Sequence, residues 1–168
     1  QGSRVLNRAM ARAAPVLQPL ALEVVHQTGA LDLAAARKRY YKIPQGWRLT
    51  AFLPRLWEEI GWADLVICRS GALTVAELAA AGRPAILVPL AAATEGHQLA
   101  NALALSEAGA ALTVREEELE SSRLAVALEE LFSNRKRLAK MGENARKLAQ
   151  PQAAKLLVDL LFEAEARG

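Results

Sequence analysis

The segment with the clearest chemical potential runs from Asp64 to Glu77 and contains a turn that could bind phosphate. An apolar run ends at Cys68, Arg69-Ser70-Gly71 predicts a sharp turn, and Leu73–Ala81 favours a helix. A strand, a tight turn and a helix in this order direct free backbone N–H groups and the positive end of the helix dipole at one place. Such a place suits a phosphate group.

Two side chains of the predicted helix could extend this contact to a whole nucleotide. Thr74 lies in the first turn and can donate a hydroxyl hydrogen bond, and Glu77, one turn later, can accept hydrogen bonds from the paired hydroxyls of a ribose. The pattern also fits an ordinary strand–helix turn, in which Ser70 or Thr74 caps the helix and Glu77 completes a capping box. A single glycine turn is less specific than a full dinucleotide fingerprint, so both interpretations stay open at this point.

The rest of the chain predicts strands and helices in alternation, which favours an α/β protein with a Rossmann-like, doubly wound parallel sheet and extra C-terminal helices. The expected strands are Leu20–Gln27, Arg48–Leu53, Asp64–Cys68, Ala85–Val88 and Ala111–Val114. The expected helices are Arg4–Ala14, Leu31–Tyr41, Leu56–Gly61, Leu73–Ala81, His97–Glu107, Glu116–Phe132, Arg135–Leu148 and Gln152–Ala166.

Ligands of such sheets bind outside the carboxyl ends of the strands. The segments expected at that edge are residues 26–29, 52–54, 69–71 and 89–98, with Gln1-Gly2 expected to join them, and all but 52–54 are polar or contain glycine. Their convergence favours a ligand site over an ordinary turn. At His26, which ends a predicted strand, a structural role is favoured over a catalytic one.

Composition narrows the class of protein further. Of the 168 residues, 52% are hydrophobic and 5% aromatic, which predicts one compact domain of helices packed on a sheet. No apolar run approaches the roughly 20 residues that span a bilayer, so we expect a soluble domain. A net charge of +3 is too small an excess to indicate nucleic acid as a partner. The single cysteine, Cys68, excludes a disulfide within the chain.

The order of elements predicts a fragment. A doubly wound domain normally begins with a strand, whereas here the first expected element is the helix that would follow it. We therefore interpret residues 1–168 as one domain cut inside a glycine-rich strand–helix turn, with its first strand outside the chain. The sequence contains no Asp-x-Asp pair, so the domain requires no metal of its own, although a divalent cation such as Mg²⁺ could accompany a diphosphate ligand.

Three segments together resemble the C-terminal half of the MurG family of bacterial N-acetylglucosaminyl transferases. They are His26-Gln27-Thr28-Gly29, Cys68–Glu77, and His97-Gln98 with Asn101-Ala102, and Gln1–Asn7 resembles the end of that family's glycine-rich turn. The resemblance covers nearly the whole chain and implies the donor-binding domain of a GT-B glycosyltransferase. It implies an inverting hexosyltransferase that moves N-acetylglucosamine from UDP-N-acetylglucosamine to lipid I, forming lipid II for peptidoglycan.

The resemblance also implies roles for individual residues. The backbone of Leu53 would bind the uracil edge, Glu77 would hold the ribose, and Gln98 with His97 would hold the hydroxyls of N-acetylglucosamine. The remaining residues expected to bind UDP-N-acetylglucosamine are Gln1, Gly2, Arg69, Ser70, Gly71, Ala72, Leu73 and Thr74. Arg69 would either orient the turn or meet phosphate. Sugar contacts from Ala91–Gly96 stay open, and no catalytic residue is expected in this chain.

The acceptor domain, which would bring lipid I and peripheral association with the cytoplasmic side of the bacterial inner membrane, would lie outside this chain. The isolated fragment is therefore expected to be inactive. Two alternatives are the donor-binding subunit of a two-chain N-acetylglucosaminyl transferase and a non-catalytic module that binds a nucleotide sugar. The first alternative requires a complete first strand at the natural N-terminus, so the genomic codons upstream of Gln1 would distinguish such a subunit from a fragment. The second would be favoured if the chain binds UDP and no partner domain is encoded nearby.

Overall fold

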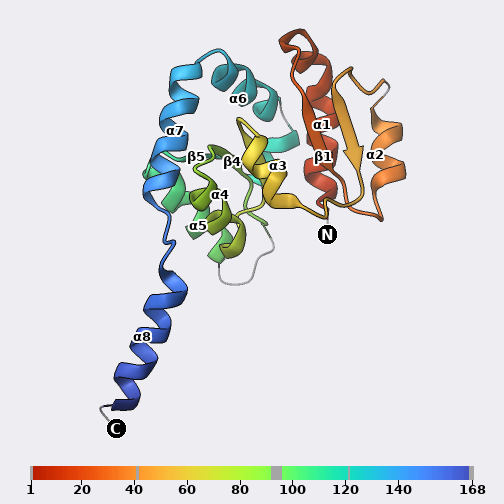
Figure 1. Ribbon diagram of the computed structural model, residues 1–168. Coiled ribbons are helices and arrows are strands. Elements are labelled where there is room, and N and C mark those ends of the chain that lie inside the picture. The colour runs from red at the N-terminus through yellow and green to blue at the C-terminus, as the bar shows by residue number, and fades with distance from the viewer. Residues whose placement is uncertain (1, 41, 92–95, 121, 167–168) are drawn as a thin grey trace.

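The computed structural model describes residues 2–40, 42–91, 96–120 and 122–166, which form a mixed α/β fold (Figure 1). The strands are β1 (Val24–Gln27), β2 (Trp47–Thr50), β3 (Val66–Cys68), β4 (Ala85–Leu87) and β5 (Ala111–Thr113). The helices are α1 (Arg4–Leu17), α2 (Leu33–Arg39), α3 (Leu56–Trp62), α4 (Ala72–Ala81), α5 (His97–Glu107), α6 (Arg123–Phe132), α7 (Arg135–Lys147) and α8 (Ala153–Ala166).

The strands of the described residues form two parallel sheets, β1-β2 and β3-β4-β5, within the α/β fold with parallel strands that the sequence predicts. The first turn of α1 lies between them. The hydroxyl of Ser3 accepts a hydrogen bond from Arg69, directly after β3 (2.9 Å), and Gly2 lies against the carbonyl of Thr28, directly after β1. Helix α1 therefore begins between the carboxyl ends of the two sheets.

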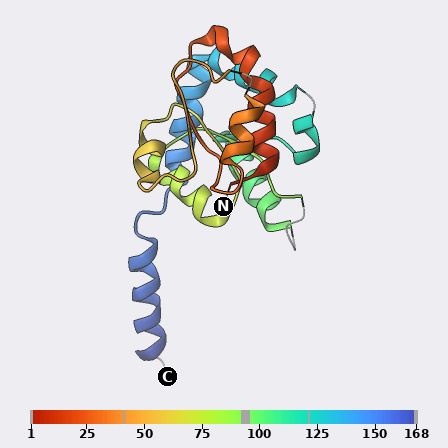
Figure 2. The ribbon, with the colours of Figure 1, turned by 90° about the vertical axis from the view of Figure 1, so that its right-hand side faces the viewer.

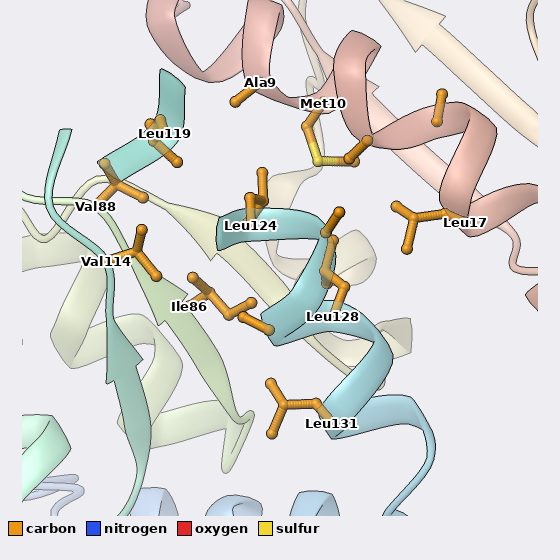
Figure 3. Close-up of a cluster of buried hydrophobic side chains, with 14 of the residues drawn as sticks. Ala9, Met10, Leu17, Ile86, Val88, Val114, Leu119, Leu124, Leu128 and Leu131 are labelled. Carbon is orange, nitrogen blue, oxygen red and sulfur yellow. The ribbon is translucent and has the colours of Figure 1, made fainter. Parts of the chain in front are cut away.

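Helices cover both faces of the three-stranded sheet, as expected for a doubly wound fold. Along β4 and the residue after it, side chains alternate between two core clusters: Ile86 and Val88 join one, and Ala85 and Leu87 join the other. The first cluster contains side chains of α1 and α6 (Figure 3), and the second contains side chains of α3, α4 and α5. All four residues are fully buried, which explains why this strand is continuously apolar in the sequence.

Two boundaries near the start of the chain differ from the prediction. Helix α1 continues through Pro15 to Leu17, because a proline in the last turn removes only one helical hydrogen bond. The first strand begins at Val24 rather than Leu20. A short 3-10 helix occupies Gln18–Leu20, and Ala21, with a φ of 47°, then turns the chain.

The long helix predicted over Glu116–Phe132 is divided in the structure. A 3-10 helix spans Glu116–Glu120, and α6 starts at Arg123. The division places Leu119, which is 1% exposed, in the core cluster beside α1, where the Arg12 side chain also donates to its carbonyl oxygen (3.0 Å). The remaining elements lie within a few residues of their predicted positions.

Helix α8 extends away from the rest of the chain (Figures 1 and 2). Four of its apolar side chains, Leu156, Leu157, Val158 and Phe162, are 48% to 65% exposed. Among the described residues, no helix has the length and apolar character needed to cross a membrane.

Candidate functional site

The predicted phosphate-binding turn forms between β3 and α4. Gly71 is the N-cap residue of α4 with no side-chain cap, and the first helical hydrogen bond runs from the Val75 N–H to the Gly71 carbonyl (3.0 Å). The N–H groups of Ala72, Leu73 and Thr74 therefore have no partner inside the helix. They lie at the positive end of its dipole, and Leu73 is 81% exposed. The turn is open to an anionic ligand.

The Glu77 side chain is exposed one turn after Thr74. Its charge acts on Cys68, the last residue of β3: burial of the thiol, and secondly the Glu77 carboxylate, raise the pKa of Cys68 to about 12. The interaction places the Glu77 carboxylate near the carboxyl end of β3. Burial, with the smaller effect of the Glu77 charge, keeps Cys68 a neutral thiol, which is a poor nucleophile.

The first turn of α5 lies beside that of α4. The hydroxyl of Ser70, a fully buried residue, donates to the carbonyl oxygen of Gln98 (2.7 Å), and the Asn101 amide donates to the carbonyl of Ser70 (3.0 Å). Gly96, in the left-handed region, is the N-cap residue of α5 with no side-chain cap. The Gln98 side chain accepts from the Leu90 N–H (3.1 Å). The Ser70 hydroxyl thus joins two helix starts instead of facing the surface.

Arg69 connects the turn after β3 to α1 and to the residues after β4. Its Nη1 donates to the carbonyl oxygens of Val88 (3.2 Å) and Pro89 (3.1 Å). The same atom donates to the carboxylate of Glu116 (2.9 Å), and Nη2 donates to the hydroxyl of Ser3 (2.9 Å). Of the two roles left open for Arg69, orientation of the turn is the one that these contacts support.

Glu116 contacts the candidate site at Arg69 and was not indicated by the sequence. Its Oε2 accepts hydrogen bonds from Arg69 and from the Ala91 N–H (3.2 Å). Burial raises its pKa, but the hydrogen bonds from Arg69 and Ala91, together with the Arg69 charge, hold that pKa below the ordinary value. Because 47 positions separate Arg69 from Glu116, no local pattern could have paired them.

The other predicted site residues lie in different settings. Gly2 packs against the turn after β1, His97 is exposed at the start of α5, and Leu53 is buried after β2, next to an exposed Phe52. Gln1 lies outside the described residues, as do residues 92–95 of the predicted ligand loop. Among the described residues, no group of three or more His, Cys, Asp or Glu side chains is placed to hold a metal ion.

A buried polar network supports the turn after β1. The Asn7 amide nitrogen donates to the carbonyl of Thr28 (2.9 Å) and to Asp32 (2.7 Å), so its oxygen is the acceptor for Nε2 of His26 (2.9 Å). Nδ1 of His26 then accepts from the Tyr40 hydroxyl (2.9 Å). Burial lowers the pKa of His26 to about 4, against the opposing charge of Asp32. His26 is a neutral structural residue, in agreement with the sequence interpretation.

We expect the change Gly2→Ala to displace the first turn of α1. A Cβ at Gly2 would stand 1.8 Å from the carbonyl oxygen of Thr28, a backbone atom that cannot rotate away. Overpacking of this kind costs about 1–3 kcal/mol, and the low end is expected here because the chain terminus can yield. Urea unfolding measures the loss. Gly61→Ala is the control, because nothing lies within 4 Å of its Cβ position, and an equal loss in both variants would contradict the prediction.

The contacts bring the first turns of α1, α4 and α5 to one edge of the sheets. Ser3 is joined to Arg69, and Ser70 is joined to Gln98. The free N–H groups of Ala72, Leu73 and Thr74 lie at the positive end of the α4 dipole, and the start of α5 beside them adds the positive end of a second helix dipole, so a group with two phosphates could contact both starts. The exposed Glu77 beside them adds a hydrogen-bond acceptor for hydroxyls. The arrangement suits a nucleoside diphosphate that carries a further polar group.

Comparison with known proteins gives a consistent match. A model of the glycosyltransferase family 28 C-terminal domain matches residues 1–157. Two relatives are named UDP-N-acetylglucosamine--N-acetylmuramyl-(pentapeptide) pyrophosphoryl-undecaprenol N-acetylglucosamine transferase. The one from Nitratidesulfovibrio vulgaris strain Miyazaki F is 44% identical over 94% of this chain and 44% of its own length. The one from Halorhodospira halophila is 47% identical over 91% of this chain and 43% of its own length.

Solved structures agree in fold. The crystal structure of Acinetobacter baumannii MurG has a TM-score of 0.85 and 34% identity, and the match covers 97% of this chain and 47% of that one. The glycosyltransferase VinC in complex with dTDP has a TM-score of 0.70 at 21% identity, over 97% of this chain and 40% of its own, which shows the fold alone. The chain thus spans less than half the length of the proteins that it matches.

Proposed function

We propose that this chain, which belongs to the glycosyltransferase family 28 C-terminal domains, binds UDP-N-acetylglucosamine as the donor half of a hexosyltransferase. The whole enzyme would transfer N-acetylglucosamine to lipid I and form lipid II for peptidoglycan. The observation that carries the proposal is the convergence of the α4 and α5 starts beside an exposed Glu77, because it pairs an anion site with an acceptor for ribose hydroxyls.

The described residues fit the departure of UDP from the anomeric carbon. Negative charge grows on the leaving diphosphate, and the N–H groups of Ala72, Leu73 and Thr74 are already oriented to stabilise it. Glu77 would hold the ribose, the backbone at Leu53 the uracil, and Gln98 with His97 the sugar hydroxyls. Any divalent cation such as Mg²⁺ would enter with the donor diphosphate. The general base of the transfer would belong to the acceptor half of the whole enzyme and not to this chain.

We also propose that residues 1–168 are one domain of a longer protein. Its first strand would lie between β1 and β3, since each of them has one hydrogen-bonded neighbour in the described sheets and α1 begins between their carboxyl ends. A separate acceptor domain would bind lipid I at the cytoplasmic side of the bacterial inner membrane, where the full-length enzyme would be peripheral. The relatives, which are more than twice as long as the matched region, leave room for such a domain.

Calorimetric titration with UDP-N-acetylglucosamine tests the proposal, with UDP, UDP-glucose and ADP as comparison ligands. We expect the uridine ligands to bind and ADP to bind at least about tenfold more weakly, a difference of about 1.4 kcal/mol. Repeating the titration with EDTA shows whether a cation contributes. Equal affinity for ADP, or no binding both here and after the upstream residues of the natural protein are restored, would contradict a uridine-diphosphate-sugar site.

A further inference from the structure

The carboxylate of Glu116 joins two parts of the chain beside the proposed donor site, the turn after β3 and the segment after β4. Oε2 accepts from Nη1 of Arg69 (2.9 Å) and from the N–H of Ala91 (3.2 Å). The other end of the same guanidinium donates to the hydroxyl of Ser3, which caps α1. One carboxylate oxygen therefore holds the segment after β4 and, through Arg69, the first turn of α1.

The position of Glu116 is itself fixed by the core. It begins the 3-10 helix Glu116–Glu120, whose Leu119 is 1% exposed in the cluster beside α1. Arg12 of α1 donates to the Leu119 carbonyl (3.0 Å). The Glu116 side chain is only 21% exposed. A carboxylate anchored in this way can set the place of its partners, instead of following them.

The residues that Glu116 holds lead to the proposed sugar contacts. Ala91 follows Leu90, whose N–H donates to the side chain of Gln98 (3.1 Å), and Gly2 stands one residue before Ser3. Within the described part of the chain, the hydrogen bonds of Glu116 go to Arg69 and Ala91 and not to Glu77 or the first turn of α4, which would bind ribose and diphosphate. Glu116 therefore acts on the part of the site that faces the sugar and its phosphate.

We propose that Glu116 is a positioning residue for the N-acetylglucosamine part of the donor: it fixes Arg69 and the Ala91 amide and thereby the distance between the first turn of α1 and Gln98. The proposal rests on the donor-binding function proposed above. The positioning role requires both a hydrogen-bond acceptor and the length of a glutamate side chain, because the donors Arg69 and Ala91 lie on separate segments and share one oxygen.

Titration of four variants of the chain with UDP and with UDP-N-acetylglucosamine tests this role. Glu116→Ala removes the acceptor, so we expect the affinity for UDP-N-acetylglucosamine to fall roughly tenfold while that for UDP changes less than about twofold. Glu116→Asp keeps the charge but is shorter by one methylene, and should show the same selective loss. Glu116→Gln keeps the length and an acceptor oxygen, and should restore most of the preference for the sugar nucleotide.

The matched control is Glu117→Ala, which removes the same charge from an exposed position of the same 3-10 helix. An equal loss for both ligands in Glu116→Asp, or no loss, would overturn the positioning role, and this comparison holds even if Glu116→Ala does not fold. In both cases the wild-type chain still binds uridine ligands, so the proposed function stands. If the wild-type chain binds neither ligand, the proposed function and this inference fail together.

Discussion

Replacing Glu77 with alanine should lower the affinity of the chain for UDP by roughly 5- to 150-fold, or about 1–3 kcal/mol. A carboxylate that accepts hydrogen bonds from ribose hydroxyls contributes more than a neutral acceptor does, and its removal leaves those hydroxyls without a partner in the complex. The loss should concern binding alone. Glu77 is exposed, and alanine has a higher helix propensity than glutamate, so α4 remains formed.

Calorimetric titration of wild type, Glu77→Ala and Glu77→Gln with UDP measures this effect, with thermal unfolding as a check on the fold. Glutamine keeps one acceptor oxygen and should fall between the other two. Glu107→Ala is the control, because Glu107 is an exposed residue at the far end of a neighbouring helix. UDP affinity that stays unchanged in Glu77→Ala would rule out the ribose role and return Glu77 to the helix-capping role considered from the sequence.

Acid should destabilise the chain through His26, beginning near pH 6.5. Burial lowers the pKa of His26 from 6.5 to about 4, so between these values the unfolded chain binds a proton that the folded chain does not. The contribution of neutral His26 to the free energy of unfolding is therefore fully present above pH 6.5 and is lost as the pH falls. We expect a loss of about 2 kcal/mol at pH 5 and about 3 kcal/mol at pH 4. Protonation would also force Nδ1 of His26 to donate toward Tyr40, whose hydroxyl now donates to it.

Urea unfolding followed by tryptophan fluorescence at several pH values measures this loss. In His26→Gln the fall between pH 6.5 and 5 should disappear, although the variant is less stable at neutral pH because Asn7 and Tyr40 lose a partner. His97→Gln, which removes the other histidine of the chain, should keep the wild-type slope. Hydrogen bonds hold the pKa of Glu116 below 4.5 and the pKa of Asp32 below 3.8, so these two carboxylates add their own losses only at lower pH. An unaltered slope in His26→Gln would contradict the assignment.

Local chemistry explains which parts of the fold could be predicted. The bounds of α5 agree with the prediction because a glycine precedes the apolar pattern and another follows it. The end of α4 was predictable because Gly82 adopts the left-handed conformation, with a φ of 62°, that closes helices. The buried strands were visible as continuous apolar runs because both faces of β4 lie in a core cluster.

The features that could not be predicted depend on contacts between residues that are distant in the sequence. Which strands pair was not encoded in any one segment, so the sequence predicted parallel strands without their order in the sheets. The predicted turn of Arg69-Ser70-Gly71 forms, but its side chains contact Glu116 and Gln98, residues far away in the sequence. A sequence can indicate that a polar turn exists at the carboxyl edge of a sheet. It does not show whether each side chain of that turn faces the ligand or its own protein.

The exposed apolar side chains of α8 make protein concentration an experimental variable. Leu156, Leu157 and Phe162 are 54% to 65% exposed on a helix that stands away from the core. Burying such a side chain gains about 1.5–3 kcal/mol, so contact with another copy, a vessel wall or a detergent micelle is favoured. Reversible self-association would add its own heat of dilution to every titration. Binding constants for this chain should therefore be extrapolated from a dilution series, with sedimentation velocity run on the same samples.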